Sequence, residues 1–283
     1  MSSARTLDGP PPELAFKRKV QVGASLRDLW RSRGLIRTLA ERDLRVRYKQ
    51  AVLGFVWAIL TPFVLMVVFT VFFQRVAKVD THGAPYPLFA YLGLIPWGFF
   101  SSCVSSGGGS ILSNISLLNK VYCPREVFPI AAVGVTVVDT TVSLAMLALI
   151  FGIYTVAPPL GGLLWLPLLL YVLLAFTLGV MFLVSAVVVY FRDLRQAIPM
   201  ILQLGLFATP VAYGMEFIPQ RYWTIYSILN PLGPVLDGLR RALLFHGSPD
   251  LSLLIPAAIS ATVWLAVGYF TFKRLETRFA DVA

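Results

Sequence analysis

Apolar runs suited to crossing a bilayer constrain this sequence more than any other feature. The hydrocarbon core of a membrane is roughly 30 Å thick, which an α-helix of about 20 apolar residues crosses. Such runs, separated by short polar or glycine- and proline-containing stretches, occur at residues 51–73, 88–106, 127–156, 163–191, 198–213 and 251–272. The sequence therefore predicts an all-α membrane protein, with six transmembrane helices in one domain over residues 51–274.

The composition supports membrane residence and argues against nucleic-acid binding. The chain has 283 residues, of which 57% are hydrophobic and 13% charged, more apolar surface than a soluble domain of this size buries. Its net charge is +10, but 12 of the 24 Lys and Arg residues precede Ala51, in a segment without nucleic-acid-binding motifs. This uneven distribution favours contact with membrane lipid.

The distribution of basic residues also predicts an orientation. Six crossings place both termini on one side, and 19 of the 24 Lys and Arg residues then lie on that side. Because cytoplasmic loops are enriched in Lys and Arg, we expect both termini in the cytoplasm, with tails at residues 1–28 and 275–283. Arg75 and Lys78 depart from the rule, since they fall in a short external loop.

Three further segments have helical periodicity but do not read as spans. Residues 29–50 place apolar side chains opposite arginines, which predicts an amphipathic helix, either in the plane of the interface or simply solvated. Residues 110–126 predict a short amphipathic helix in a loop, preceded by Gly107–Gly109 as a flexible hinge. Residues 235–245 predict a similar short helix on the external side.

The sequence lacks the residue patterns of several kinds of chemistry. The phosphate-binding pattern Gly-x-x-x-x-Gly-Lys-Ser/Thr is absent from the sequence, so ATP and Mg²⁺ would have to bind to another subunit. His82 and His246 are far apart and have no metal-ligand spacing, and acidic residues are not clustered. We therefore expect no catalytic residue, metal site or cofactor in this chain.

Asp139 is the one acidic residue inside a predicted spanning run. A charge at that depth is costly, which indicates a function or a buried partner. A proton-coupled transporter uses such a carboxylate, and a structural hydrogen bond to a neighbouring helix explains it equally well. The spanning runs contain no obvious basic partner for it.

Aromatic side chains crowd the first two runs. They are typical of interface anchors and lipid-facing residues, and they also suit a wall on which pyranose rings stack and slide. The candidates for such a substrate channel are Trp57, Phe63, Phe69, Phe72, Tyr91, Trp97, Phe99 and Phe100.

Several motifs occur in an order that resembles the ABC-2 type polysaccharide export permeases. They are YKQAVLGFVWA at 48–58 followed by Pro62, LIPWGFF at 94–100, Asn114 with 117–126, YFRD at 190–193, and Asn230-Pro231. The resemblance covers residues 35–274. It does not separate exporters of O-antigen, capsule and teichoic acid.

The resemblance implies a homodimeric permease subunit in the bacterial cytoplasmic (inner) membrane. Its expected partners are two copies of a cytoplasmic ATP-binding subunit and an undecaprenyl-linked polysaccharide. Residues 29–50 would be an interface helix, 113–125 the helix that couples to the ATPase, and 217–245 a pair of short external helices that re-enter the outer leaflet. The coupling candidates are Ser113, Asn114, Leu117, Asn119, Lys120, Arg125 and Glu126.

Cations near the cytoplasmic surface suit an anionic pyrophosphate. The candidates are Arg45, Arg47 and Lys49, and anchoring at the membrane interface is the alternative role for them.

Two other classes of protein are alternatives to the exporter. A proton-coupled secondary transporter would depend on Asp139 and on a proton gradient, and a membrane-embedded glycan-modifying enzyme would form product without an ATPase.

Overall fold

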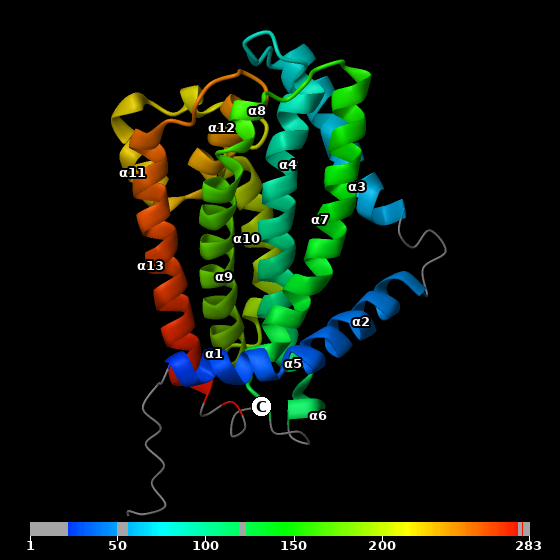
Figure 1. Ribbon diagram of the computed structural model, residues 1–283, viewed down its shortest axis with the longest axis vertical. Helices are drawn as coiled ribbons and strands as arrows, with labels where there is room; N and C mark the ends of the chain where they lie inside the picture. The colour runs from blue at the N-terminus through cyan, green and yellow to red at the C-terminus, as the bar shows by residue number, and fades with distance from the viewer. Residues whose placement is uncertain (1–21, 50–55, 119–122, 277–278, 280–283) are drawn as a thin grey trace, which may run out of the picture.

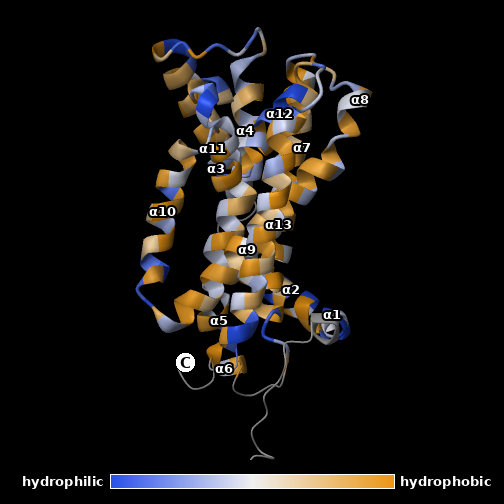
Figure 2. Cartoon of the chain, turned by 90° about the vertical axis from the view of Figure 1, so that its left-hand side faces the viewer, coloured by the Kyte–Doolittle hydropathy of each residue, from blue (hydrophilic) through white to orange (hydrophobic). Residues whose placement is uncertain are grey.

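A computed structural model describes residues 22–49, 56–118, 123–276 and 279 of the chain. Within these ranges all regular secondary structure is helical, as predicted. The long helices stand side by side in an elongated bundle (Figure 1), and apolar residues dominate most of its length (Figure 2). Helices satisfy their backbone hydrogen bonds internally, which hydrocarbon surroundings require.

Among the described residues, five helical stretches of 18 to 31 residues are long and apolar enough to cross a membrane. They coincide with five of the predicted runs, with ends shifted by a few residues, although residues 51–55 of the first run lie outside the described part. The stretches lie within α3 (Val56–Phe69) with η2 (Thr70–Val76), α4 (Tyr86–Ser102) with η3 (Cys103–Gly107), α7 (Val127–Ile153), α8 (Leu160–Leu163) with α9 (Leu166–Tyr190), and α13 (Leu251–Leu275), and the first of them begins at Ile59.

The remaining run, predicted at 198–213, is the shorter helix α10 (Leu194–Ala208). Its length of 15 residues corresponds to about 22 Å, less than the roughly 30 Å of a hydrocarbon core. The predicted end at residue 213 is wrong: Thr209 is extended, because the ring of Pro210 disfavours helical geometry in the residue before it. A sixth crossing through α10 stays a prediction.

The two ends of the bundle differ in what they carry. Helix α1 (Val22–Arg31) and the end of α13 lie at the same end (Figure 1). The opposite end carries α8 and the two short helices α11 (Trp223–Leu229) and α12 (Leu232–Leu243), preceded by the 3-10 turns Met215–Phe217 and Gln220–Tyr222. The short helix predicted at 235–245 is α12, and α11 is its neighbour.

The segment predicted as one amphipathic helix at 29–50 contains the end of α1 and the whole of α2 (Arg33–Lys49), and both helices lie across the end of the bundle (Figure 1). They meet at Ser32, whose hydroxyl donates to the carbonyl oxygen of Asp28 at 2.9 Å. Leu39 is buried against the bundle. The predicted tail over 1–28 is wrong for its last residues, because α1 begins at Val22.

The loop after the triple glycine also differs from the predicted single helix at 110–126. It contains two separate helical turns, α5 (Ser110–Ser113) and α6 (Ile115–Leu118), with non-helical Asn114 between them. Asn114 donates its side-chain amide to the carbonyl oxygen of Ser110 at 2.9 Å, a local bond that competes with helix continuation. Residues 119–122 lie outside the described part.

The triple glycine has a packing role that the predicted hinge did not include. Gly107 and Gly108 have helical backbone geometry, and a Cβ atom on them would lie 2.5 Å from the sulfur of Met181 and 2.7 Å from a methyl group of Val184. Both partners belong to α9. Hydrogen in place of a side chain therefore allows η3 to pack directly on α9.

A close helix crossing in the bundle joins α9 to α13. A Cβ atom on Gly268 would lie 2.0 Å from the carbonyl oxygen of Gly179, and one on Gly179 would lie 2.5 Å from the carbonyl oxygen of Trp264. Backbone therefore packs on backbone here, as in small-residue contacts between membrane helices. This contact fixes α13 against the centre of the bundle.

Replacing Gly268 with alanine is expected to destabilise the protein by about 1 to 3 kcal/mol, because the added methyl group must separate two backbones. The measurement is the unfolding midpoint of the purified protein in detergent. Gly152→Ala is the matched control, since no atom lies within 4 Å of its new Cβ, and it should be neutral or slightly stabilising. Equal effects of the two substitutions would contradict this account of the crossing.

Candidate functional site

A cavity of about 470 Å³ lies between α2, α3, α4 and α7, and Leu206 of α10 completes its wall. We call it the polar cavity. Its lining combines a charged pair, hydroxyl groups and aromatic rings. The polar and aromatic residues that line it are Arg47, Tyr48, Trp57, Thr61, Trp97, Phe99, Ser101, Ser102, Thr136, Asp139, Thr140 and Ser143.

The charged pair consists of Asp139 and Arg47, with Tyr48 as a third member. Arg47 donates from Nη1 to one carboxylate oxygen of Asp139, and the hydroxyl of Tyr48 donates to the other. Burial, followed by the bond to Asp139, raises the pKa of Tyr48 to about 12, so Tyr48 stays a donor at neutral pH. A basic partner for Asp139 could not be predicted from the spanning runs, because Arg47 reaches it from α2, which lies outside them.

The hydroxyl groups present acceptors to the cavity. Thr61 donates to the carbonyl oxygen of Trp57 at 3.1 Å, and Thr140 donates to that of Thr136 at 2.8 Å, one helical turn earlier in each case. A hydroxyl group has one donor hydrogen and two acceptor lone pairs. With the donor used on the helix backbone, these side chains can accept hydrogen bonds from a polyhydroxylated ligand.

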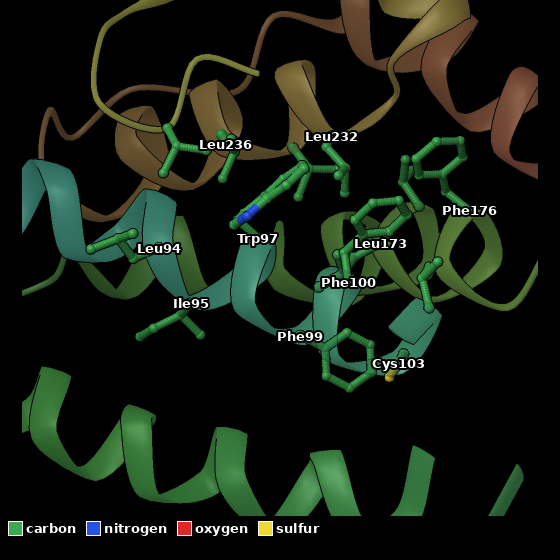
Figure 3. Close-up of a cluster of buried hydrophobic side chains, with 14 of the residues drawn as sticks. Leu94, Ile95, Trp97, Phe99, Phe100, Cys103, Leu173, Phe176, Leu232 and Leu236 are labelled. Carbon is green, nitrogen blue, oxygen red and sulfur yellow. The ribbon is translucent and has the colours of Figure 1, made fainter. Parts of the chain in front are cut away.

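Three of the eight aromatic candidates, Trp57, Trp97 and Phe99, line the polar cavity. Phe100 lies elsewhere: it stacks on Phe176 of α9 with ring centroids 5.3 Å apart, and Figure 3 shows Phe99 on another side of α4. Successive helical residues point about 100° apart, so neighbouring aromatics in a run reach different surroundings. A channel role for the three that line the cavity stays a prediction.

The other four aromatic candidates do not line the cavity. Phe63 and Phe72 are exposed on the outer side of α3 and η2, whereas Phe69 and Tyr91 are buried in the core. The structure therefore does not assemble the eight into one wall within a single chain.

The three basic candidates for pyrophosphate binding are not brought together. Arg47 lines the cavity in its pair with Asp139, whereas Arg45 is exposed and outside the cavity lining. Residues two apart on a helix do not share a face, which explains the separation. The side chain of Lys49 lies outside the described part.

Two of the predicted coupling residues are joined to other elements. Asn114 accepts from Nη2 of Arg42 on α2 at 2.7 Å, and Ser113 accepts from Nη2 of Arg195 on α10 at 3.3 Å. Leu117 packs against the core. Asn119 and Lys120 lie outside the described residues.

The other two coupling candidates face inward. Glu126 is 1% exposed and forms an ion pair with Lys273 near the end of α13, and the hydroxyl of Tyr269 lies 3.4 Å from one of its oxygens. Arg125 lies over the ring of Phe279 at 5.7 Å. Sequence reasoning missed Lys273, because a basic residue at a helix end reads as an interface anchor.

Arg240 of α12 is counted from the sequence as an external basic residue. In the structure its side chain is buried. Its guanidinium donates to four backbone carbonyl oxygens, at 2.6 to 3.2 Å, and lies 3.6 Å from the ring centroid of Phe89. The guanidinium group stays charged in proteins, and these acceptors together with the aromatic ring offset its burial. The accepting residues are Phe89, Pro210, Val211 and Tyr213. Arg240 therefore ties α12 to α4 and to the turn after α10.

The chain is similar to known membrane transport proteins. The family model of the ABC-2 type transporters matches residues 34–244. The O-antigen export system permease protein RfbA of Myxococcus xanthus is 31% identical, over 89% of this chain and 96% of that protein. RfbA of Klebsiella pneumoniae is 26% identical over 88% and 94% of the two chains. The polysialic acid transport protein KpsM of Escherichia coli is also 26% identical, over 88% and 91%.

The pairing of Arg47 with Asp139 is open to a double-mutant cycle. Arg47→Gln and Asp139→Asn should each lower the free energy of unfolding, because each leaves the other charge without its partner. The double variant should lose less free energy of unfolding than the two single variants lose together. The expected coupling energy is about 1 kcal/mol, as measured by denaturant unfolding in detergent. Arg45→Gln, at an exposed site on the same helix, is the control. Additive effects of the two substitutions would show that the side chains do not interact.

Proposed function

This chain belongs to the ABC-2 type transporter family, and from that premise we propose that it is the permease subunit of an ATP-driven polysaccharide exporter. The observation that carries the proposal is its similarity to O-antigen export permeases over about nine-tenths of both chains. It is a transport subunit rather than an enzyme, and ATP hydrolysis belongs to a separate subunit. We propose O-antigen or a related surface polysaccharide as the cargo.

The polar cavity supports a carbohydrate cargo. The rings of Trp57 and Trp97 offer apolar faces for pyranose rings, and the hydroxyl groups offer acceptors for sugar hydroxyls. We propose that the glycan is linked to undecaprenyl pyrophosphate, and that this anion competes with the Asp139 carboxylate for Arg47. Because Arg47 is already paired with Asp139, it would have to leave that carboxylate in order to bind a diphosphate.

The end of the bundle that carries α1, α2, α5 and α6 is proposed to face the cytoplasm and two copies of the ATP-binding subunit. The bonds Arg42–Asn114 and Arg195–Ser113 support this, since they join the loop between α4 and α7 to α2 and α10. A displacement of this loop by the ATPase would therefore be carried to both helices.

The arrangement in the bacterial inner membrane is proposed to include six crossings, with α10 as the short one. Both ends of the described chain lie at one end of the bundle, which an even number of crossings produces. Helices α1 and α2 would lie in the membrane interface, and α11 and α12 would re-enter the outer leaflet.

We further propose a homodimer. Exposed Val64, Val68 and Phe72 form an apolar surface on α3 and η2 that lipid or a second copy of the chain could cover.

A proton-coupled carrier based on Asp139 is less well supported by the geometry. Both carboxylate oxygens of Asp139 accept from neighbouring donors, one of them a cation, so the charged form has its partners in place. A carboxylate that carries protons within a membrane has to exchange its charge during transport. The pairing therefore favours a structural role for Asp139 in the exporter.

Transport by the purified chain in vesicles is expected to require the cognate ATP-binding subunit and ATP. A fluorescent lipid-linked oligosaccharide would be followed across the bilayer with the chain alone, with the complex, and with a complex whose ATPase cannot hydrolyse ATP. We expect net transport by the intact complex. The chain alone and the complex with the inactive ATPase should give only the transport rate of protein-free vesicles. Transport by the chain alone, or by the inactive complex under a proton gradient, would contradict the proposed function.

A further inference from the structure

A second cavity, of about 260 Å³, separates α10 from α4 and α9. We call it the α9–α10 crevice and define it by Trp97, Val180, Val184, Ile198, Leu202 and Gly205. We propose that the crevice binds the polyprenyl tail of the lipid carrier while the pyrophosphate and first sugars occupy the polar cavity. This inference rests on the proposed function and adds a tail-binding site to it.

The crevice has the shape that an extended hydrocarbon chain needs. Ile198, Leu202 and Gly205 line it from one face of α10, as does Ala208 further along. Ten residues of helix separate Ile198 from Ala208, which corresponds to about 15 Å at 1.5 Å per residue. The lining thus follows α10 lengthwise, as a linear ligand requires.

Helix α9 forms the opposite wall over a similar length. Phe176, Val180 and Val184 line the crevice at intervals of four residues, which places them on one face of α9. These two walls border a narrow space between neighbouring helices, with the ring of Phe176 stacked on Phe100 of α4.

The chemistry of the crevice is that of a hydrocarbon site. Among the described residues that line it, none is charged, and its polar side chains, Thr209 and Asn230, lie beyond the end of α10. Asn230 donates to the hydroxyl of Thr209 at 2.8 Å, so these two groups satisfy each other. An apolar chain fills such a space without any loss of hydration, whereas a sugar or a phosphate loses its hydration there.

Trp97 connects this crevice to the polar cavity. Its side chain lines both spaces, so a single ring separates them. Helix α10 contributes to both from adjacent positions, with Leu206 in the polar cavity and Gly205 in the crevice. A Cβ atom on Gly205 would lie 2.8 Å from the edge of the Trp97 ring, so glycine is what lets the ring lie against α10.

The contrast between the two cavities identifies the ligand as an amphiphile. One space holds a cation, hydroxyl groups and aromatic faces, and the adjoining one is apolar and elongated. A lipid-linked glycan has both chemistries in one molecule, joined at its pyrophosphate. The shared wall at Trp97 places the two cavities side by side and therefore favours the carrier's own tail over an unattached membrane lipid.

Loose packing of α10 leaves room for such a chain. Of its 15 residues, all within the described part, only Ile198 is buried. Leu204 and Phe207 are exposed on a face that does not line the crevice. The face of α10 toward α9 is thus only partly covered by protein, which leaves room for a ligand.

The test uses the permease–ATPase complex in nanodiscs and a long-chain polyprenyl pyrophosphate disaccharide with a diazirine near the end of its tail. Leu202→Trp fills the crevice, and Leu204→Trp adds the same ring on the exposed side of α10, outside the crevice lining, as the matched control. We expect photolabelling of peptides from α9 and α10, reduced roughly tenfold by Leu202→Trp and changed less than about twofold by Leu204→Trp. A probe with a two-isoprene tail should not label them.

Other outcomes overturn the inference in distinguishable ways. Competition of the label by a phospholipid as effectively as by unlabelled polyprenyl pyrophosphate would assign the crevice to ordinary membrane lipid. Equal labelling of the two tryptophan variants would place the tail elsewhere. Neither of these two results would contradict the proposed cargo, provided that the disaccharide probe still binds and that its binding still depends on Arg47. Loss of all specific binding in the unsubstituted complex would reject the cargo itself. Thermal unfolding of both variants checks that each is folded.

Discussion

Asp139 can lie within an apolar helix because two donors from α2 reach its carboxylate. An unpaired charge at that depth would be costly, and Arg47 and Tyr48 supply both the opposite charge and the hydrogen bonds. The same contacts hold the end of α2 against α7 and give the polar cavity its charged lining. Other features of the site, the hydroxyl groups one turn away on α7 and the rings of Trp57 and Trp97, gather around this pair.

Buried cations recur as connectors between elements distant in sequence. Arg240 binds four carbonyl oxygens where the turn after α10 approaches α4, and Lys273 joins the end of α13 to the start of α7 through Glu126. Each cation satisfies groups that would otherwise lack partners, which offsets its own desolvation. The bundle is thus fixed at both ends by charges, and along its middle by the glycine contacts of α9 and α13.

The sequence predicted the long apolar helices well, because apolar runs such as residues 251–272 depend on local composition alone. It failed where one residue decides the local geometry: Pro210 ends α10 early, and Asn114 divides the loop predicted as one helix. It also could not pair Asp139 with Arg47, which lies 92 residues away in the chain, or tell buried Arg240 from a surface cation. Such pairings depend on tertiary contacts that a periodic pattern does not contain.

Glycan is proposed to occupy the polar cavity beside the Arg47–Asp139 pair. The most direct measurement is a cryo-electron microscopy structure of the permease with its ATP-binding subunit, stalled by an ATPase that cannot hydrolyse ATP and loaded with lipid-linked glycan. The account predicts sugar density between Trp57 and Trp97, with the pyrophosphate within hydrogen-bonding distance of Arg47. Glycan density along another path, with the polar cavity empty and the Arg47–Asp139 pair intact, would contradict it.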